Sequence, residues 1–403
     1  MIEKLPTFLE SAGRTFGPEE EALVLEVLRS GCLTRNGGKM VRQLEAEFAH
    51  KLGVAHAVAC SSGTASVHLA IAALDPEPGA EIIVPPITDI GSILPILWQN
   101  AVPVFGDVDP VTMTLDPSDV AARITPCTRA IVAVHLAGQP CAMRELRELA
   151  DRHNLALIED CSQAYWAEYD GKLAGTMGDM ACFSLQQSKH ITCGEGGLFV
   201  TSNSDYARRA QLFADKAWPR ESKSLGSSRF LFLAQNYRMS ELQGAVALGQ
   251  LSKIEFSVSR RRECAERLNS LIADIPSVSA PHVPEGTKSS YWLYMLHVAY
   301  PTAREFGDLL VAEGVPAWVE YIVDPLYLSP LFKERKTYGM SGYPFTEYPS
   351  QEYRKGLCPK AERVLHEVIA ILWNENFTAG HVEQIANAIR KVATMSALVP
   401  MTR

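Results

Sequence analysis

Three short segments of this 403-residue sequence carry side chains that could act together on one substrate. The segment Ser61-Ser62-Gly63-Thr64-Ala65-Ser66 follows an apolar run and opens a helical pattern, so its backbone N–H groups could bind a phosphate. Asp160 ends a second apolar run, where an ionised carboxylate is costly unless a cation meets it. Lys189 follows a third apolar run and precedes Gly194-Glu195-Gly196-Gly197; its amine could form a Schiff base if desolvation lowers its pKa.

Each segment taken alone has a simpler interpretation. A serine-rich start caps many helices, an aspartate often caps the end of a strand, and a lysine in a turn is usually solvated. The order of the three favours the chemical interpretation, because all three simple explanations must otherwise hold at once. A phosphate-type helix start, then a carboxylate for a protonated pyridine nitrogen, then a strand-end lysine are what a pyridoxal-phosphate site needs.

The elements that must position these residues are alternating strands and helices between about Gly53 and Ser202. A helix opens at Thr64, with apolar positions at the spacing of one helical face, and Met143–Arg152 is a second amphipathic helix. Apolar runs predict strands at Ala57–Cys60, Glu81–Val84, Val102–Phe105, Ala130–Leu136, Ala156–Glu159, Met180–Leu185 and Leu198–Thr201. This pattern predicts an α/β fold with a mainly parallel sheet covered by helices, and a ligand at the carboxyl ends of its strands.

The pattern changes near residue 251. A long charged helix is predicted at Leu251–Ile272, and a smaller α+β region follows it. Its predicted elements are a strand at Trp292–Ala299, helices at Thr302–Glu313 and Ala379–Lys391, and a long loop at Leu326–Gln351. The chain exceeds the length at which one core stops growing, so we expect a large domain over residues 1–250, with an N-terminal arm, and a small domain over 251–403.

Composition excludes several classes of protein. The net charge of −8 gives no electrostatic reason to expect nucleic acid or an anionic membrane as partner. No apolar stretch reaches the ~18 residues of a membrane-spanning helix, and the first residues do not resemble a secretory signal. The nine cysteines show neither a C-x-x-C pair nor zinc spacing, so we expect reduced thiols, a cytoplasmic protein and no metal.

Further motifs extend this pattern over nearly the whole chain, and together they resemble the DegT/StrS family of sugar aminotransferases. The resemblance implies the aspartate-aminotransferase fold, which is fold type I of the pyridoxal-phosphate enzymes, with a seven-stranded sheet. Besides the three segments above, the matching motifs are Gly31-Cys32-Leu33-Thr34, Val134-His135-Leu136-Ala137-Gly138, Glu159-Asp160-Cys161-Ser162-Gln163-Ala164, Asn236-Tyr237-Arg238-Met239-Ser240-Glu241-Leu242-Gln243 and Cys358-Pro359-Lys360-Ala361-Glu362.

The resemblance implies a role for each matching residue. Lys189 would form the Schiff base with the cofactor and shuttle the proton, and Asp160 would pair with the pyridine nitrogen. Gln163 would hydrogen-bond near the ring hydroxyl. Asn236 would reach the phosphate of the neighbouring subunit, which would make a homodimer with shared sites a requirement. The residues that would lie at the phosphate are Gly63, Thr64, Ala65 and Ser184. Those that would face the substrate are His135, Arg238 and His190. His135 could equally be a structural histidine.

Three departures from the family pattern bear on the substrate. Asp89 stands where relatives usually carry an aromatic residue stacked on the cofactor ring. A carboxylate cannot stack in that way, so another residue covers the ring, Asp89 touches substrate, or the register differs. Ala137 replaces a frequent aromatic residue. The segment Leu372-Trp373-Asn374-Glu375-Asn376 replaces a turn that contains proline and histidine in many relatives.

The resemblance implies a reaction in two halves. Glutamate or glutamine would leave its amino group on the cofactor as pyridoxamine phosphate, which would then aminate a ketone. Most relatives act on nucleotide-linked keto-sugars, whereas the pair Gln186-Gln187 resembles aminotransferases of keto-cyclitols. Alternatives are a sugar dehydratase of the same fold, which tends to carry histidine in place of Lys189, and a non-catalytic regulatory homologue. A nucleotide-binding dehydrogenase would need a G-x-G-x-x-G turn after the first strand, and Ser61–Ala65 is not one.

Overall fold

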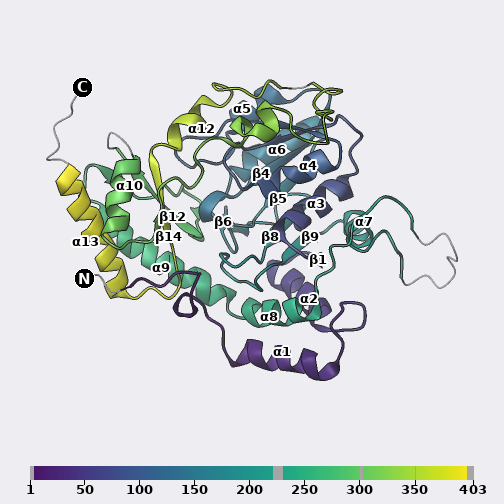
Figure 1. Cartoon of the computed structure of the whole chain (residues 1–403), viewed down its shortest axis with the longest axis horizontal. Helices are drawn as coiled ribbons and strands as arrows, with labels where there is room; N and C mark the ends of the chain where they lie inside the picture. The colour runs from purple at the N-terminus through teal and green to yellow at the C-terminus, as the bar shows by residue number, and fades with distance from the viewer. Residues whose placement is uncertain (1–3, 221–229, 300–302, 350, 397–403) are drawn as a thin grey trace.

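The computed structural model describes residues 4–220, 230–299, 303–349 and 351–396, and at its centre is a seven-stranded sheet (Figure 1). The strand order is β1-β9-β8-β5-β4-β2-β3. Neighbouring strands are parallel except at β9, which is antiparallel to both β8 and β1. The prediction of a mainly parallel sheet is therefore confirmed. The strands are β1 His56–Cys60, β2 Glu81–Val84, β3 Val102–Phe105, β4 Thr128–Val134, β5 Ala156–Asp160, β8 Met180–Ser184 and β9 Gly197–Thr201.

Helices cover both faces of this sheet because successive strand residues point to opposite sides. On β4, Val132 and Val134 join the core beneath one set of helices, whereas Ile131 and Ala133 join the core beneath another. The first set comprises α3 Gly63–Leu74, α4 Leu94–Trp98 and α7 Ser204–Ala214; the opposite face carries α2 Met40–Leu52, α5 Pro117–Arg123, α6 Met143–His153 and α8 Glu241–Leu251. Helix α1, Pro18–Ser30, packs on α8.

A second, antiparallel sheet with the order β10-β12-β14-β13 forms the C-terminal region. Helices α9, α10 and α13 share a separate apolar core with it. Its elements are α9 Ile254–Ile272, β10 Val278–Ser279, β12 Leu293–Val298, α10 Ala303–Ala312, β13 Ala317–Trp318 and β14 Val368–Leu372, with α13 Ala379–Ser396 at the end. A small three-stranded sheet joins β6 Glu168–Tyr169 and β7 Lys172–Leu173 to β11 Thr287–Lys288.

The long charged helix expected at Leu251–Ile272 is confirmed as α9, which begins three residues later at Ile254, after a break from α8 at Ser252 and Lys253. One other predicted element was wrong. The segment Leu326–Gln351 was expected to be a loop, but it contains a 3-10 helix at Leu326–Leu328 and helix α11 at Pro330–Lys333. The structure also has helix α12 at Pro359–Val364. The first residue of the helix predicted at Thr302–Glu313 lies outside the described residues.

One face of the C-terminal sheet shares its own core with α9, α10 and α13, whereas Leu293, Met295 and Ala370 on the other face join the core of the central sheet. We propose to keep the domain boundary after residue 250, next to the α8–α9 break. The segment around α11 also packs on the large domain, since Phe332 lies against Phe105 of β3 with ring centroids 5.1 Å apart. The N-terminal arm also crosses the boundary, because Leu5 belongs to the C-terminal core. None of the helices in the described residues is both long and apolar enough to cross a membrane.

Candidate active site

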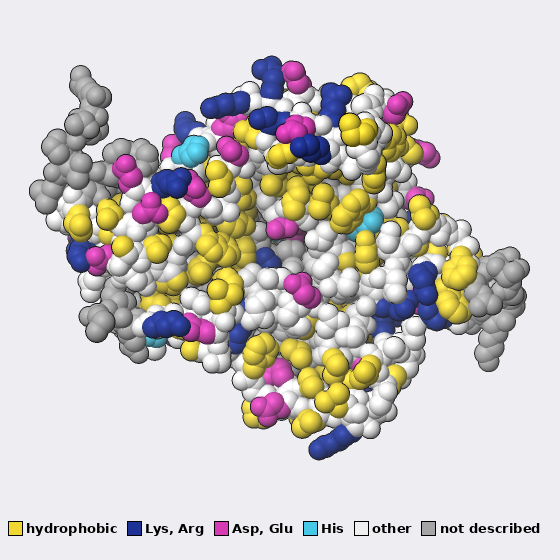
Figure 2. All heavy atoms as spheres, in the orientation of Figure 1, with side chains coloured by type: hydrophobic (Ala, Val, Ile, Leu, Met, Phe, Trp, Pro, Cys, Tyr) yellow, Lys and Arg dark blue, Asp and Glu magenta, His cyan; other side chains and the backbone are white. Residues whose placement is uncertain are grey.

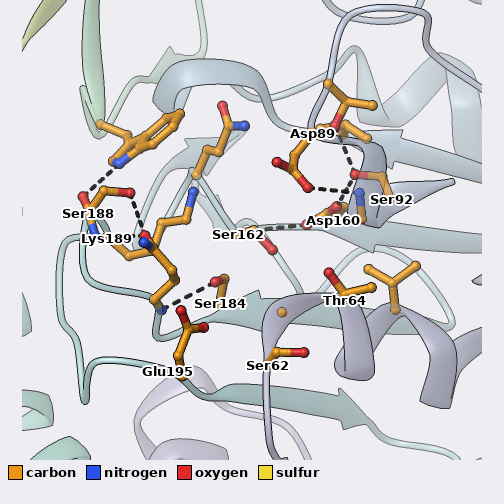
Figure 3. Close-up of a pocket in the computed structure, with 18 of the residues that line it drawn as sticks. Ser62, Thr64, Asp89, Ser92, Asp160, Ser162, Ser184, Ser188, Lys189 and Glu195 are labelled. Carbon is orange, nitrogen blue, oxygen red and sulfur yellow. Dashed lines mark hydrogen bonds between the residues drawn. The ribbon is translucent and has the colours of Figure 1, made fainter. Parts of the chain in front are cut away.

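The parallel strands bring the predicted residues to one edge of the sheet. Val134 of β4 pairs in register with Asp160 of β5, which pairs with Cys182 of β8 two residues before Ser184. The start of α3 lies against the same edge. These strand ends surround a cavity of about 370 Å³ (Figure 3). Lys189, Asp160 and the start of α3 therefore line one cavity, although about 125 residues of sequence separate Gly63 from Lys189.

Lys189 is almost completely buried, with 9% of its surface exposed. Its Nζ atom lies 3.7 Å from the ring centroid of Trp292. Burial lowers the pKa of this amine to about 8, against the opposing charges of Asp160 and Asp89. An amine with a pKa in this range is partly unprotonated near neutral pH, which is the form that attacks an aldehyde.

Asp160 is held as an acceptor by two donors at the carboxyl end of β5. Ser92 Oγ donates to Asp160 Oδ2 at 2.7 Å, and the backbone N–H of Ser162 donates to Oδ1 at 3.0 Å. Thr88 Oγ1 lies 2.8 Å from Ser92 Oγ. Since the Ser92 proton points to the carboxylate, Thr88 is the donor in that second bond. The chain Thr88–Ser92–Asp160 was not predicted; its only sequence signal is a pair of hydroxyl residues four apart after β2.

The start of α3 has the form of an anion site. Ser62 caps the helix by accepting the N–H of Ala65 at 3.0 Å, while Gly63 and Thr64 supply the first N–H groups of the helix. A Cβ added at Gly63 would stand 2.6 Å from the Cβ of Ser184, so only glycine permits this close approach to β8. Ala65 itself does not line the cavity; its side chain is buried in the core.

Aromatic residues of the C-terminal region form one wall of the cavity. Trp318 and Tyr321 are stacked with ring centroids 5.8 Å apart, and Trp292 lies beside both. Gln163 joins this wall to the sheet edge, because its Nε2 donates to the Tyr321 hydroxyl at 3.0 Å while its Oε1 accepts the N–H of Ala137 at 2.8 Å. These three aromatic residues were not predicted, since no local sequence pattern marks them as part of a site.

Asp89 lines the cavity and is exposed at its mouth. Its Oδ1 accepts the N–H of Gly91 at 2.7 Å, which caps the 3-10 helix Ile90–Ser92. Glu195 is also exposed and lines the cavity from another loop (Figure 3). Ala137 is buried and outside the lining.

Two predicted histidines do not line the cavity. His135 is fully buried, where its Nδ1 accepts the N–H of Cys141 at 3.0 Å and its Nε2 donates to Glu159 at 3.0 Å. Glu159 also accepts backbone N–H groups of the loop after β7, so this pair braces that loop. His190 donates from Nε2 to the carbonyl of Ser290, and burial holds the pKa of its ring well below 6.5. Neither residue is therefore part of the lining where the resemblance would place a substrate contact.

Asn236 and Arg238 also lie outside the cavity lining of their own chain. Arg238 forms an ion pair with Asp215, which pairs with Arg220 as well. Asn236 is exposed and forms a β-bridge with Asp215. The segment around Asn374 is likewise outside the lining, so its departure from the family pattern does not act on a substrate by contact within one chain.

The donor set fits pyridoxal phosphate. A buried amine faces a buried carboxylate, and a glycine-opened helix start with the Thr64 and Ser184 hydroxyls provides an anion site. When bound, this cofactor supplies an electron sink next to the substrate carbon. The fold and this site together define a pyridoxal-phosphate-dependent aminotransferase.

Comparison with known proteins agrees with this class. The sequence model of the DegT/DnrJ/EryC1/StrS aminotransferase family matches residues 15–390, and the chain belongs to this family. It is 38% identical to L-glutamine:2-deoxy-scyllo-inosose aminotransferase of Streptomyces kanamyceticus over 76% of this chain and 74% of the relative. It is 36% identical to GDP-perosamine synthase of Caulobacter vibrioides, over 74% and 79%. The solved structure of 3-amino-5-hydroxybenzoic acid synthase superimposes with a TM-score of 0.84 at 26% identity, covering 98% of this chain and 99% of that one. The enzyme is thus an aminotransferase of amino-sugar or aminocyclitol biosynthesis.

Proposed function

We propose that this enzyme moves an amino group from glutamine or glutamate to the ketone of a sugar or cyclitol, with Lys189 as its catalytic residue. The observation that carries the proposal is the burial of the Lys189 amine in the same cavity as Asp160 and the start of α3. Lys189 would hold the cofactor and, in each half-reaction, would move the proton between the substrate carbon and the cofactor carbon. Asp160, oriented by its two donors, would pair with the protonated pyridine nitrogen.

The other cavity residues would orient the cofactor. Gly63, Thr64 and Ser184 would bind its phosphate, and the Ala65 N–H, already bonded to Ser62, would support the helix start rather than contact the phosphate. Gln163 would lie near the ring hydroxyl, fixed by its bond to Tyr321. The wall of Trp292, Trp318 and Tyr321 would exclude water from the reacting carbons.

We further propose a homodimer with composite sites in the cytoplasm. Asn236 is exposed outside its own cavity, which suits a contact to the phosphate in a neighbouring subunit. All nine cysteines are unpaired, and several are buried, as is usual in a reducing compartment. The arginines near Asn236 would then lie beside the same interface.

The cofactor and the lysine are tested by absorbance. Protein loaded with pyridoxal phosphate should show a visible band that borohydride fixes covalently on Lys189, and the Lys189→Ala variant should lack it. Glutamine or glutamate should bleach the band, and a keto acceptor should restore it. A band that survives in Lys189→Ala refutes the lysine assignment. No bleaching with any amino acid favours a regulatory homologue, and release of water from a keto-sugar without amination favours a dehydratase.

Composite sites are tested by mixing two inactive variants. A heterodimer of Lys189→Ala and Asn236→Ala chains contains one site with both native residues and one with neither. Mixing and reassembly should therefore restore activity if Asn236 serves the partner's site. No recovery, with heterodimers demonstrated by native mass spectrometry, contradicts the shared site.

A further inference from the structure

The pair Gln186-Gln187 lies in the catalytic loop, residues 186–190, and its two side chains face different surroundings. Gln186 lines the cavity, where its Oε1 accepts both the N–H and the hydroxyl of Ser188 at 2.7 Å. Gln187 is outside the lining, and its Nε2 donates to the carbonyl of Phe8 at 2.9 Å. Gln187 therefore contacts the N-terminal arm instead of a substrate in the cavity of its own chain.

The N-terminal arm, residues 4–17, runs from the C-terminal region to α1 (Figure 1). Its residue Phe8 contacts two parts of the active site at once. The Phe8 carbonyl accepts from Gln187, and the buried Phe8 ring packs edge-on against Trp318, with ring centroids 6.0 Å apart. Trp318 belongs to the aromatic wall of the cavity. One residue outside the cavity thus connects the catalytic loop to this wall.

Arg14 adds a second contact from the arm to the catalytic loop. Its Nη1 donates to the carbonyl of Lys189 at 3.0 Å, and its Nε donates to the carbonyl of Phe8 at 3.4 Å. The Arg14 guanidinium also lies 5.9 Å from the centroid of the Phe8 ring. Phe8, Arg14 and Gln187 therefore form one connected group, in which the Phe8 carbonyl is the shared acceptor.

The arm is anchored at both of its ends. Leu5 is buried in the C-terminal core. Near α1, Lys253 Nζ donates to the carbonyl of Thr15 at 2.6 Å. Between these points the arm folds back on itself so closely that a Cβ at Gly13 would stand 1.9 Å from the carbonyl oxygen of Thr7. A segment fixed in this way can hold a neighbouring loop in place, whereas a free chain end could not.

The wall that Phe8 contacts also touches the catalytic lysine. Trp318 lies beside Trp292, with ring centroids 6.2 Å apart, and the Lys189 amine lies 3.7 Å from the centroid of Trp292. Trp292 Nε1 donates to the carbonyl of Ser188 at 2.8 Å. Figure 2 shows hydrophobic side chains over the C-terminal region beside the hollow near the centre of this face. The position of Lys189 against this wall therefore depends on contacts from both sides.

Building on the proposed function, we propose that Phe8 is a positioning residue, which fixes the catalytic loop and the aromatic wall relative to each other and so holds the Lys189 amine at the reacting carbons. The family model matches residues 15–390, so Phe8 and Arg14 precede the matched region. The arm acts through the loop and the wall, because Phe8 itself does not line the cavity.

The first measurement is the steady-state rate of the loaded enzyme. Phe8→Ala should lower kcat about tenfold with little change in the KM for the amino donor, because a small displacement of a reacting group is costly. Gln187→Ala should lower kcat about threefold to tenfold. Phe8→Leu keeps an apolar side chain against Trp318 and should restore most of the rate. Leu9→Ala is the matched control, since Leu9 is 76% exposed and its loss should leave kcat unchanged.

The second measurement separates positioning from a loss of stability. Burial lowers the pKa of the Lys189 amine to about 8, against the charges of Asp160 and Asp89. These acids, and Glu195 in the same lining, are unchanged in every variant. A loosened loop admits water to the amine, so the pH midpoint of cofactor uptake by the empty enzyme should rise by about half a unit or more in Phe8→Ala and Gln187→Ala. Lower thermal stability without this rise overturns the inference.

The double variant tests whether Phe8 and Gln187 act through one connection. If they do, adding Gln187→Ala to Phe8→Ala should slow the reaction by less than about twofold further. Losses that multiply as independent effects overturn the inference, as do wild-type rates in both single variants. An enzyme whose visible band neither glutamine nor glutamate bleaches refutes the proposed function instead, while the midpoint of cofactor uptake still tests the arm.

Discussion

Replacing Ser92 by alanine should impair the enzyme although Ser92 belongs to none of the sequence motifs. Its hydroxyl donates to Asp160 Oδ2 at 2.7 Å, and both side chains are 3% exposed. A hydrogen bond to a charged group contributes roughly 1.5–3 kcal/mol. A carboxylate with one donor fewer competes more strongly for the proton on the ring nitrogen. We therefore expect kcat to fall about tenfold to hundredfold, with little change in the KM for the amino donor.

The assay pairs steady-state rates with a pH titration of the visible band. A ring nitrogen that shares its proton differently changes the pH midpoint of that band, which a loss of packing alone would not move. Ser92→Thr keeps the hydroxyl and should restore both measurements. Thr88→Val removes only the neutral bond to Ser92, worth about 0.5–1.5 kcal/mol, and should have the smaller effect. A Ser92→Ala enzyme with an unchanged midpoint and kcat would show that Asp160 does not depend on this chain.

Three further predictions concern the lysine and its surroundings. Uptake of cofactor by the empty enzyme should accelerate as pH rises through about 8, where Lys189 loses its proton. In Asp160→Asn the pH midpoint of uptake should be lower, because the Asp160 carboxylate raises the pKa of the Lys189 amine. Stopped-flow absorbance would measure the midpoint in both enzymes. Gly63→Ala should weaken cofactor binding by about tenfold or more, since the added Cβ would stand 2.6 Å from the Ser184 Cβ. Equilibrium dialysis measures the cofactor affinity, and an unchanged affinity would contradict the prediction. Arg14→Met removes the 3.0 Å bond to the Lys189 carbonyl and should reduce kcat without abolishing the visible band, whereas wild-type kcat would deny Arg14 a positioning role.

The sheet and the three main site segments could be predicted because their signals are local. A buried parallel strand is a short apolar run, and its end places the next polar residue at the carboxyl edge. Asp160 and Ser184 stand at such ends, and Lys189 follows in the next turn. Helix α9 could be predicted in the same way, with its start placed three residues early.

The rest of the cavity depends on contacts between distant segments. Trp292 and Tyr321 come from the C-terminal region, and nothing in their local sequence shows that they face Lys189. Ser92 and Thr88 are ordinary hydroxyl residues until the sheet places β2 and β5 on either side of β4. Such residues become visible only when the tertiary structure fixes which hydroxyl meets which carboxylate.

The segment Asn374–Asn376 shows how a departure from a family pattern can be assigned to the wrong cause. Its position suggested a changed substrate, but Asn374 donates to the carbonyl of Gly13 at 3.1 Å and Asn376 to that of Ala12 at 2.9 Å. These bonds fix the N-terminal arm, and the next residue of that arm, Arg14, donates to the carbonyl of Lys189. The changed segment therefore acts on the catalytic loop from behind, through the arm.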